Sequence, residues 1–322
     1  MAAIVELALA MFPASSPFEL PSPGRTVAIF GFLYLDTIKA LSKICRCECR
    51  IYKCDVTEVN RLEADLASGL HINALFTEFP GNPLLQTPDL GRLQCLAERY
   101  HFALVVDDTL STCVNVNIIS ACDAICTSLS KMFSGACDVM GGSIILSPTT
   151  SFRGRLQGKL GSTHRPDAWF CQDADIMELN SRHFPARCRL ASSNAQKMAR
   201  QLKEHETVDE VYYPWGSPSQ RLYDKYKVHD GGYGFLISIR FKTPSKAKRF
   251  YDALETCKGP SLGTNFTLAC AYTLLAHYNE LPWAAEYGVV EHLVRISVGI
   301  ESEEWLALRV RKALRAATSC LE

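Results

Sequence analysis

The clearest pattern along the chain is a repeated alternation between short apolar runs and segments with helical periodicity. The apolar runs predict strands, and the amphipathic segments between them predict helices. In the first half of the chain the expected strands are 27–30, 50–53, 74–79, 103–107, 124–129 and 142–146. The expected helices are 36–43, 59–67 and 89–100. Because strands that alternate with helices usually form parallel sheets, this half predicts an α/β fold with a mainly parallel sheet.

The pattern changes after Pro148, where helices become longer and strands fewer. We expect helices at 168–179, 185–205, 245–256 and 303–316, and strands at 208–213, 233–241 and 293–299. This order is typical of a smaller α+β unit. The prediction is therefore a large domain over 1–150, a connecting helical segment over 151–185 and a C-terminal α+β domain over 186–322.

The first twelve residues are apolar and allow two interpretations. A signal peptide would begin with basic residues and have an uninterrupted apolar stretch, whereas this segment has no basic residue and is interrupted by Glu6. A buried or amphipathic helix fits better. The stretch 15–23, rich in proline and serine, predicts a loop after it.

Composition excludes several classes of protein. The chain has 322 residues with 34 Lys+Arg and 34 Asp+Glu, so its formal net charge is zero, which argues against a nucleic-acid surface. No apolar run has the length of a membrane span, so no membrane partner is expected. The 14 cysteines are scattered through a long chain, which favours reduced thiols and a cytoplasmic protein.

One cysteine cluster deserves a separate interpretation. Cys45, Cys47, Cys49 and Cys54 stand close together in the sequence, and a metal site is one reading of them. Their spacing differs from that of the usual zinc sites. Cysteines that alternate with charged residues are more typical of a segment leading into a strand, in which the thiols lie on the buried face. No metal is therefore predicted.

Lys131 is the first candidate for chemistry. Alone, a lysine after a strand is most often a solvated surface residue. Here Ser128 and Ser130 stand three positions and one position before it, and two hydroxyls on one turn suit a phosphate dianion. A lysine in this setting is a candidate for covalent chemistry with an aldehyde.

Asp107 is the second candidate, because it ends a buried apolar run. An unpaired buried carboxylate is costly, so a partner is expected. The alternatives are a helix cap, a structural ion pair, or a protonated ring nitrogen. Asp107 and Lys131 lie about one strand–helix–strand step apart, so both can face one crevice at the carboxyl ends of the strands. An amine, a carboxylate and phosphate-binding hydroxyls are the set that pyridoxal 5′-phosphate requires.

Three further side chains stand out from their surroundings. Asn82 lies in a Pro-Gly-Asn-Pro turn and either forms that turn or binds a ligand oxygen. Tyr34 follows an early strand and either stacks on a planar ring or fills core. Arg295 is a charge within an apolar strand, for which a substrate carboxylate is a natural partner.

These residues lie in segments that resemble the cystathionine γ-synthase group of the trans-sulfuration (Cys/Met metabolism) enzymes, in particular its fungal-type branch. The resemblance extends over nearly the whole chain in the family's order. The matching segments are 30–37, 76–89, 105–109, 127–142, 259–267 and 293–301. It implies a fold-type I, aminotransferase-like architecture and a homo-oligomer, either a dimer or a tetramer made of dimers.

The resemblance also implies roles for individual residues. Lys131 would be the lysine that binds pyridoxal 5′-phosphate and carries protons, and Asp107 would face the ring nitrogen. Tyr34 would stack on the ring as a further catalytic residue. The remaining implied contacts are Asn82 with the phenolic oxygen, Ser128 and Ser130 with the phosphate, and Arg295 and Ser261 with the substrate carboxylate. The implied reaction is γ-replacement on an O-acetyl- or O-succinyl-homoserine by a thiol such as cysteine, in amino-acid or secondary metabolism.

The start of the chain falls within a family segment, Ser-Gly-Met-Ala-Ala-Ile, whose backbone N–H groups bind the phosphate. Met1 matches the methionine of that segment, so it is expected at the cofactor. The resemblance predicts a chain that lacks its N-terminal part. The alternative function is accordingly a catalytically weak or inactive relative that acts as a non-catalytic partner. A dinucleotide-binding oxidoreductase, suggested by the α/β pattern alone, is disfavoured because no G-x-G-x-x-G follows an early strand.

Overall fold

A six-stranded sheet forms the centre of the first half of the molecule. The structure, a computed structural model, describes residues 1–12, 24–163 and 169–318; the predicted loop 15–23 lies outside them. The strand order is β2-β1-β3-β4-β5-β6, with every pair parallel except β5 and β6. The bounds are β1 Thr26–Phe30, β2 Glu48–Tyr52, β3 Ala74–Glu78, β4 Ala103–Asp107, β5 Ala124–Ser128 and β6 Gly142–Leu146. The predicted mainly parallel sheet is confirmed.

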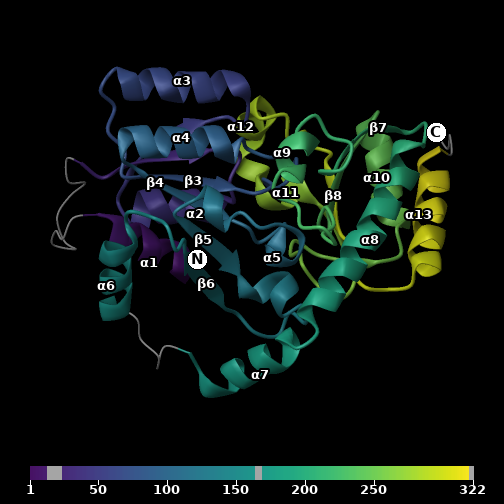
Figure 1. The fold of residues 1–322 in the computed structure, drawn as a ribbon. Helices are drawn as coiled ribbons and strands as arrows, with labels where there is room; N and C mark the ends of the chain where they lie inside the picture. The colour runs from purple at the N-terminus through teal and green to yellow at the C-terminus, as the bar shows by residue number, and fades with distance from the viewer. Residues whose placement is uncertain (13–23, 164–168, 319–322) are drawn as a thin grey trace.

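Helices cover both faces of this sheet (Figure 1). On one face lie α3 (Val56–Ala67) and α4 (Leu90–Tyr100), whose apolar sides pack on the sheet in one buried cluster. On the other face lie α1 (Ala2–Met11) and α6 (Arg153–Thr163), which share a second cluster. Strands buried on both faces read as continuous apolar runs, which explains why the sequence pattern is strong in this half.

The positions of α3 and α4 follow from their end residues. Asp55 and Asp89 each accept a hydrogen bond from the backbone N–H three residues later, at the N-terminus of α3 and α4 respectively. In α3, Val59, Leu62 and Leu66 repeat at helical spacing and are buried. These helices therefore start where the sequence provides caps, and each turns one apolar face to the sheet.

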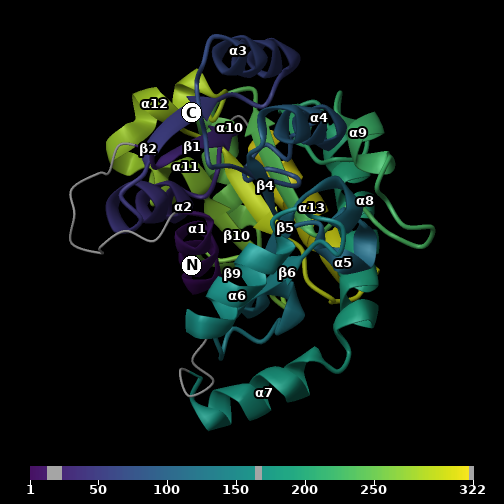
Figure 2. The same cartoon turned by 60° about the vertical axis from the view of Figure 1, so that its left-hand side comes forward.

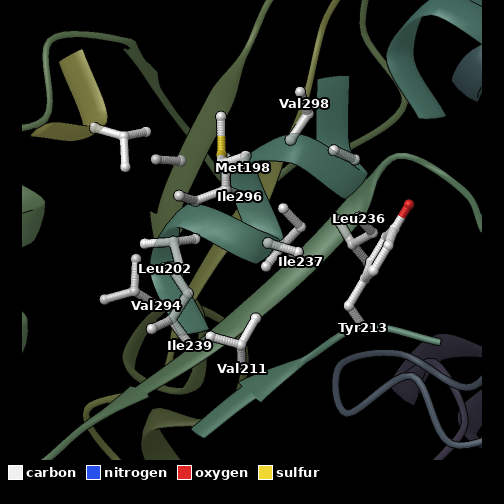
Figure 3. Close-up of a cluster of buried hydrophobic side chains, with 14 of the residues drawn as sticks. Met198, Leu202, Val211, Tyr213, Leu236, Ile237, Ile239, Val294, Ile296 and Val298 are labelled. Carbon is white, nitrogen blue, oxygen red and sulfur yellow. The ribbon is translucent and has the colours of Figure 1, made fainter. Parts of the chain in front are cut away.

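A second sheet of five strands forms the other half, in the order β7-β8-β11-β10-β9. Its strands are β7 Val208–Tyr212, β8 Leu236–Phe241, β9 Cys257–Lys258, β10 Leu268–Ala271 and β11 Val294–Ser297. Three helices pack on it: α8 Phe184–Lys203, α10 Pro244–Ala253 and α13 Glu303–Thr318. Figure 3 shows part of the resulting core, where Met198 and Leu202 of α8 meet Ile237, Ile239 and Ile296 of the sheet. The predicted smaller α+β part is thus present.

Shorter elements complete the chain. They are α2 Leu35–Lys39, α5 Thr112–Asn115, α9 Gln220–Asp224, α11 Tyr272–Ala276 and α12 Leu281–Glu286. Helix α7 (Cys171–Ser181) lies apart from both sheets, at the bottom of Figures 1 and 2. Within the described ranges, no helix has the length and apolar character needed to cross a membrane.

Several predicted boundaries are wrong. The expected helix 36–43 is a short α2 followed by a π-helical turn, Ala40–Ile44. Strand 233–241 begins only at Leu236, because Gly234 has a positive φ of 86° that interrupts an extended chain. Strands β9 and β10 and helix α6 were not predicted, since their residues lack a clear period.

The cysteine cluster is part of the core. Cys45 and Cys47 are buried under the first sheet, and Cys49 packs against the same apolar cluster. Burial raises the pKa of the Cys45 thiol to about 11 and that of Cys47 to about 12. These are neutral thiols with a structural role, as the alternation of the sequence indicates.

Candidate active site

The candidate active site lies where the carboxyl ends of β3, β4 and β5 meet the second sheet. Lys131 follows β5 in a tight turn, Leu129–Phe133, in which its own backbone is non-helical at φ −93° and ψ −132°. Its Nζ donates a hydrogen bond to Ser261 Oγ at 3.2 Å, across 130 residues of sequence. Gly263 makes this approach possible, because a Cβ there would lie 2.8 Å from Lys131 Cβ and 2.6 Å from the backbone nitrogen of Met132.

The amine of Lys131 is tuned toward its neutral form. Burial lowers its pKa, and the positive charge of Arg295 lowers it further, against an opposing effect of Cys137. A neutral amine is the nucleophilic form of lysine. The lowered pKa therefore favours the form of Lys131 that covalent chemistry requires.

Asp107 lies at the end of β4, next to β5, and is only partly exposed. Its Oδ1 accepts the backbone N–H of Thr109 at 2.9 Å. Burial raises its pKa, while the hydrogen bonds from Thr109 lower it. In the described residues Asp107 and Lys131 occupy the ends of neighbouring strands without bonding one another, so a ligand between the strand ends can contact both.

The two predicted phosphate hydroxyls differ in their surroundings. Ser130 Oγ accepts the backbone N–H of Gly141 at 2.9 Å and donates to its carbonyl at 3.3 Å. Ser128 donates its backbone N–H to Thr109 Oγ1 at 2.8 Å. The hydroxyl of Ser130 is thus already engaged with the backbone, and the phosphate-binding role of the two serines stays a prediction. Met1 precedes the first turn of α1 and contributes its carbonyl to the N–H of Val5.

Arg295 and Asn82, predicted from separate segments, are in direct contact. Arg295 is 3% exposed, and its Nη1 donates to Asn82 Oδ1 at 3.0 Å. Its Nη2 donates to the carbonyls of Pro260 at 2.6 Å and Ser261 at 3.2 Å. Its guanidinium also lies 4.6 Å from the centre of the Tyr272 ring, whose hydroxyl accepts from Asn82 Nδ2 at 3.1 Å. These contacts fix Arg295 next to the residue that holds the Lys131 amine.

Tyr34 lies just before α2 and is 50% exposed. Its hydroxyl donates to Asp36 Oδ2 at 3.0 Å. Burial and the Asp36 carboxylate raise its pKa, whereas Arg295 lowers it, which places its ring within the electrostatic reach of that arginine. An exposed aromatic face at this position is available for stacking on a planar ligand.

Three contributors to the site were not predicted from the sequence. Thr109 connects Asp107 to Ser128. Glu78, at the end of β3, accepts the backbone N–H groups of Tyr34 and Asn82. The signal for Glu78 was present, because an acid that ends a buried apolar run had already singled out Asp107.

Arg187 of α8 is the third. Its guanidinium donates to the carbonyls of Met132 at 3.0 Å and Phe133 at 2.7 Å, directly after Lys131. It also donates to Asn265 Oδ1 at 2.8 Å and to the Asn180 carbonyl at 2.9 Å. It therefore connects the lysine turn with the segment that carries Ser261. Nothing in the local sequence signals a distant contact of this kind.

Comparison with known proteins identifies the family. The family model described as "Cys/Met metabolism PLP-dependent enzyme" matches residues 13–315. The chain belongs to this family, whose members use pyridoxal phosphate. This confirms the family resemblance inferred from the sequence segments.

Individual relatives agree with that assignment. A cystathionine gamma-synthase from Neurospora crassa is 45% identical over 89% of this chain and 46% of its own length. One from Saccharomyces cerevisiae is 39% identical over 92% of this chain and 47% of its own. A "cystathionine gamma-synthase-like enzyme" from Amanita muscaria, iboG2, is 42% identical over 92% and 51% respectively. The chain therefore spans about half the length of the curated relatives it matches.

A solved structure supports the fold. The cystathionine gamma synthase of Xanthomonas oryzae pv. oryzae, determined in complex with cystathionine, superposes with a TM-score of 0.82. The match covers 98% of this chain and 80% of that one, at 24% identity. The predicted fold-type I architecture is confirmed.

The residues present fit the cofactor of the family. The carboxylate of Asp107 has an oxygen that can accept a ring N–H, and the amine of Lys131 has a lowered pKa. Tyr34 offers an exposed aromatic ring. The carboxylate and the amine come from the ends of the neighbouring strands β4 and β5, and the aromatic ring follows β1 in the same sheet. Ligands bind at such strand ends in open α/β sheets.

Proposed function

We propose that this chain performs pyridoxal-phosphate-dependent γ-replacement on an activated homoserine ester, O-acetyl- or O-succinyl-homoserine, with a thiol such as cysteine. The product would be cystathionine or a related amino acid. The observation that supports this best is the contact chain from the Lys131 amine through Ser261 to Arg295. This contact chain supports the proposal because it connects an amine with a lowered pKa to a guanidinium, the group that best matches an amino acid's α-carboxylate.

The cofactor, when bound, withdraws electrons from the carbon attached to the substrate amine. Asp107 would accept the ring N–H and keep that nitrogen protonated, and Tyr34 would stack on the ring. Asn82 would donate to the phenolic oxygen, and Ser128, Ser130 and the start of α1 at Met1 would hold the phosphate. These assignments are the ones that the family resemblance implies, and the location of Asp107 and Lys131 at neighbouring strand ends supports them.

Lys131 has two duties in this proposal. Its Nζ would hold the cofactor, and when free it would take and return protons. Its lowered pKa suits both, because a general base is most effective when its pKa is near the working pH. Ser261, which accepts from Nζ, keeps the amine oriented.

Arg295 and Ser261 orient the substrate. The guanidinium is nearly inaccessible to solvent and already held by three oxygens of the protein, so it presents a fixed charge. A carboxylate bound there directs the rest of the substrate toward Lys131.

The test is an assay of the purified chain supplied with pyridoxal phosphate, each acyl-homoserine in turn, and cysteine. Formation of cystathionine, with loss of activity in Lys131→Ala, supports the proposal. A chain that binds the cofactor yet turns over neither ester contradicts it. We also propose that the chain assembles as a homo-oligomer, a dimer or tetramer, which sedimentation of the same sample measures.

A further inference from the structure

Glu78 is a buried carboxylate that the proposed chemistry does not use. It is the last residue of β3, is 8% exposed, and pairs in the sheet with Asp107 at the end of β4. The groups that shift its pKa include no lysine, arginine or histidine. Burying a carboxylate without a neighbouring cation costs free energy, so a carboxylate retained in this position suggests a function in the site.

The contacts of Glu78 suggest that role. Its Oε1 accepts the backbone N–H of Tyr34 at 2.6 Å, and its Oε2 accepts that of Asn82 at 2.9 Å. One carboxylate thus joins the segment after β1 to the segment after β3. Each carboxylate oxygen has one of the two donors, and only the ionised form accepts fully on both.

We propose that Glu78 is a positioning residue whose ionised carboxylate holds Tyr34 and Asn82 in place around the cofactor. The contacts of those two side chains with the cofactor rest on the proposed function, but the two hydrogen bonds to Glu78 do not. Loss of either bond frees the backbone that orients a cofactor-contacting side chain.

The same geometry makes the link dependent on pH. Burial, and then the charge of Asp107, raise the pKa of Glu78 to about 8, against the two N–H bonds that lower it. Above that pH both bonds are made; below it one oxygen carries a proton and faces a donor. The link therefore strengthens as pH rises through about 8.

Other titratable groups surround Glu78. Asp107 and Cys126 line a small space with it on the β4–β5 side, and Tyr272 at the start of α11 lies within electrostatic range of it. A cavity of about 150 Å³ lies on its other side, and the titratable residues that line it are Lys53, Cys54, Asp55, Glu286 and Tyr287. Of all these groups, only Asp107 contributes to the pKa of Glu78.

The direct test is an NMR titration of the ¹⁵N-labelled chain without cofactor. We expect the backbone amide protons of Tyr34 and Asn82 to shift together, with a common midpoint near pH 8. Glu78→Gln should abolish both shifts. Independent midpoints, or a titration that persists in Glu78→Gln, would overturn the proposal. The measurement on the unaltered chain is informative even where the variant does not fold.

A second test measures the dissociation constant of pyridoxal phosphate. At pH 9, Glu78→Gln should weaken binding about tenfold, the effect of one charge-assisted hydrogen bond, and at pH 6 the difference should vanish. In a Tyr34→Ala/Asn82→Ala background the same substitution should have little effect. An equal loss in that background would show that Glu78 acts through its charge on Asp107 instead.

The two tests separate the inference from the function on which it rests. If the unaltered chain does not bind pyridoxal phosphate, the proposed function fails, and the amide titration alone decides the role of Glu78. If the cofactor binds but the amides do not titrate together, only the role of Glu78 is overturned.

Discussion

The two sides of the site handle charge in opposite ways. On the side of the first sheet, burial moves both key groups toward neutrality, raising the pKa of Asp107 and lowering that of Lys131. On the side of the second sheet, Arg295 keeps a fixed charge in a buried place because three protein oxygens accept its hydrogen bonds. The groups on the first side are thus suited to proton transfer, and the guanidinium on the second side is suited to fixing the position of a bound ligand.

This difference implies that substitutions on the two sides should fail in different ways. Changes at Asp107 or Lys131 should affect chemistry and cofactor attachment. Changes at Arg295 or its supports should mainly affect the placement of substrate or the stability of the turn, apart from a small effect of the Arg295 charge on the pKa of Lys131. The following predictions test that division, from the largest expected effect to the smallest.

The largest effect is expected for Asp107→Asn. If Asp107 pairs with the ring nitrogen as proposed, removing its charge should cost about 3–5 kcal/mol, which corresponds to a loss of about 150- to 5,000-fold in kcat. The matched control is Asp108→Asn, whose carboxylate is also buried but bonds the Thr127 hydroxyl instead. Steady-state kinetics of both variants test this prediction. Equal losses of kcat would show that negative charge near the end of β4 matters in general and that the specific position of Asp107 does not.

Arg295→Lys should act mainly on substrate binding. Lysine keeps the charge but loses the fork that a carboxylate matches, so KM for the acyl-homoserine should rise about ten- to a hundredfold. The dissociation constant of pyridoxal phosphate should change little. A variant with an unaltered KM but weakened cofactor binding would contradict the division between the two sides.

Arg187→Met should weaken the connection between the two sides of the site. It removes hydrogen bonds to the carbonyls that follow Lys131, so we expect a loss of about 1–3 kcal/mol in the free energy of unfolding. Arg187→Lys should restore part of this loss. Denaturant unfolding of both variants gives the values, and a Met variant as stable as the unaltered chain would refute the role.

The smallest effect is a shift in pH dependence. Arg295 lowers the pKa of Lys131, so Arg295→Gln should raise it. The neutral amine would then require a higher pH, so the acidic limb of cofactor attachment should move to higher pH. Arg295→Lys, which keeps the charge, should leave that limb in place. Stopped-flow absorbance over a pH series measures both.

The sequence predicted the parts of this site that depend on local pattern. Asp107 and Lys131 end apolar runs, and strands of a parallel sheet bring such ends together, so their neighbourhood followed from the alternation alone. Arg295 was noticeable because a charge within an apolar strand needs a partner.

What the sequence did not predict depends on contacts between distant segments. The four hydrogen bonds of Arg187 reach residues 132, 133, 180 and 265, and no local period marks them. The engagement of Ser130 with Gly141 likewise follows from the pairing of β5 with β6, where the antiparallel register was not foreseen. Glu78 differs, since the rule applied to Asp107 would have found it.

The most direct test of the account is the visible absorbance of the purified chain with pyridoxal phosphate, before and after borohydride reduction, followed by peptide mass spectrometry. We predict an absorbance band that reduction converts into a covalent label on Lys131, absent in Lys131→Ala. The label should remain in Lys248→Ala, a change of an exposed lysine on α10. A band that is indifferent to Lys131→Ala, or no band at all, would contradict the central claim that this lysine is the cofactor's attachment site.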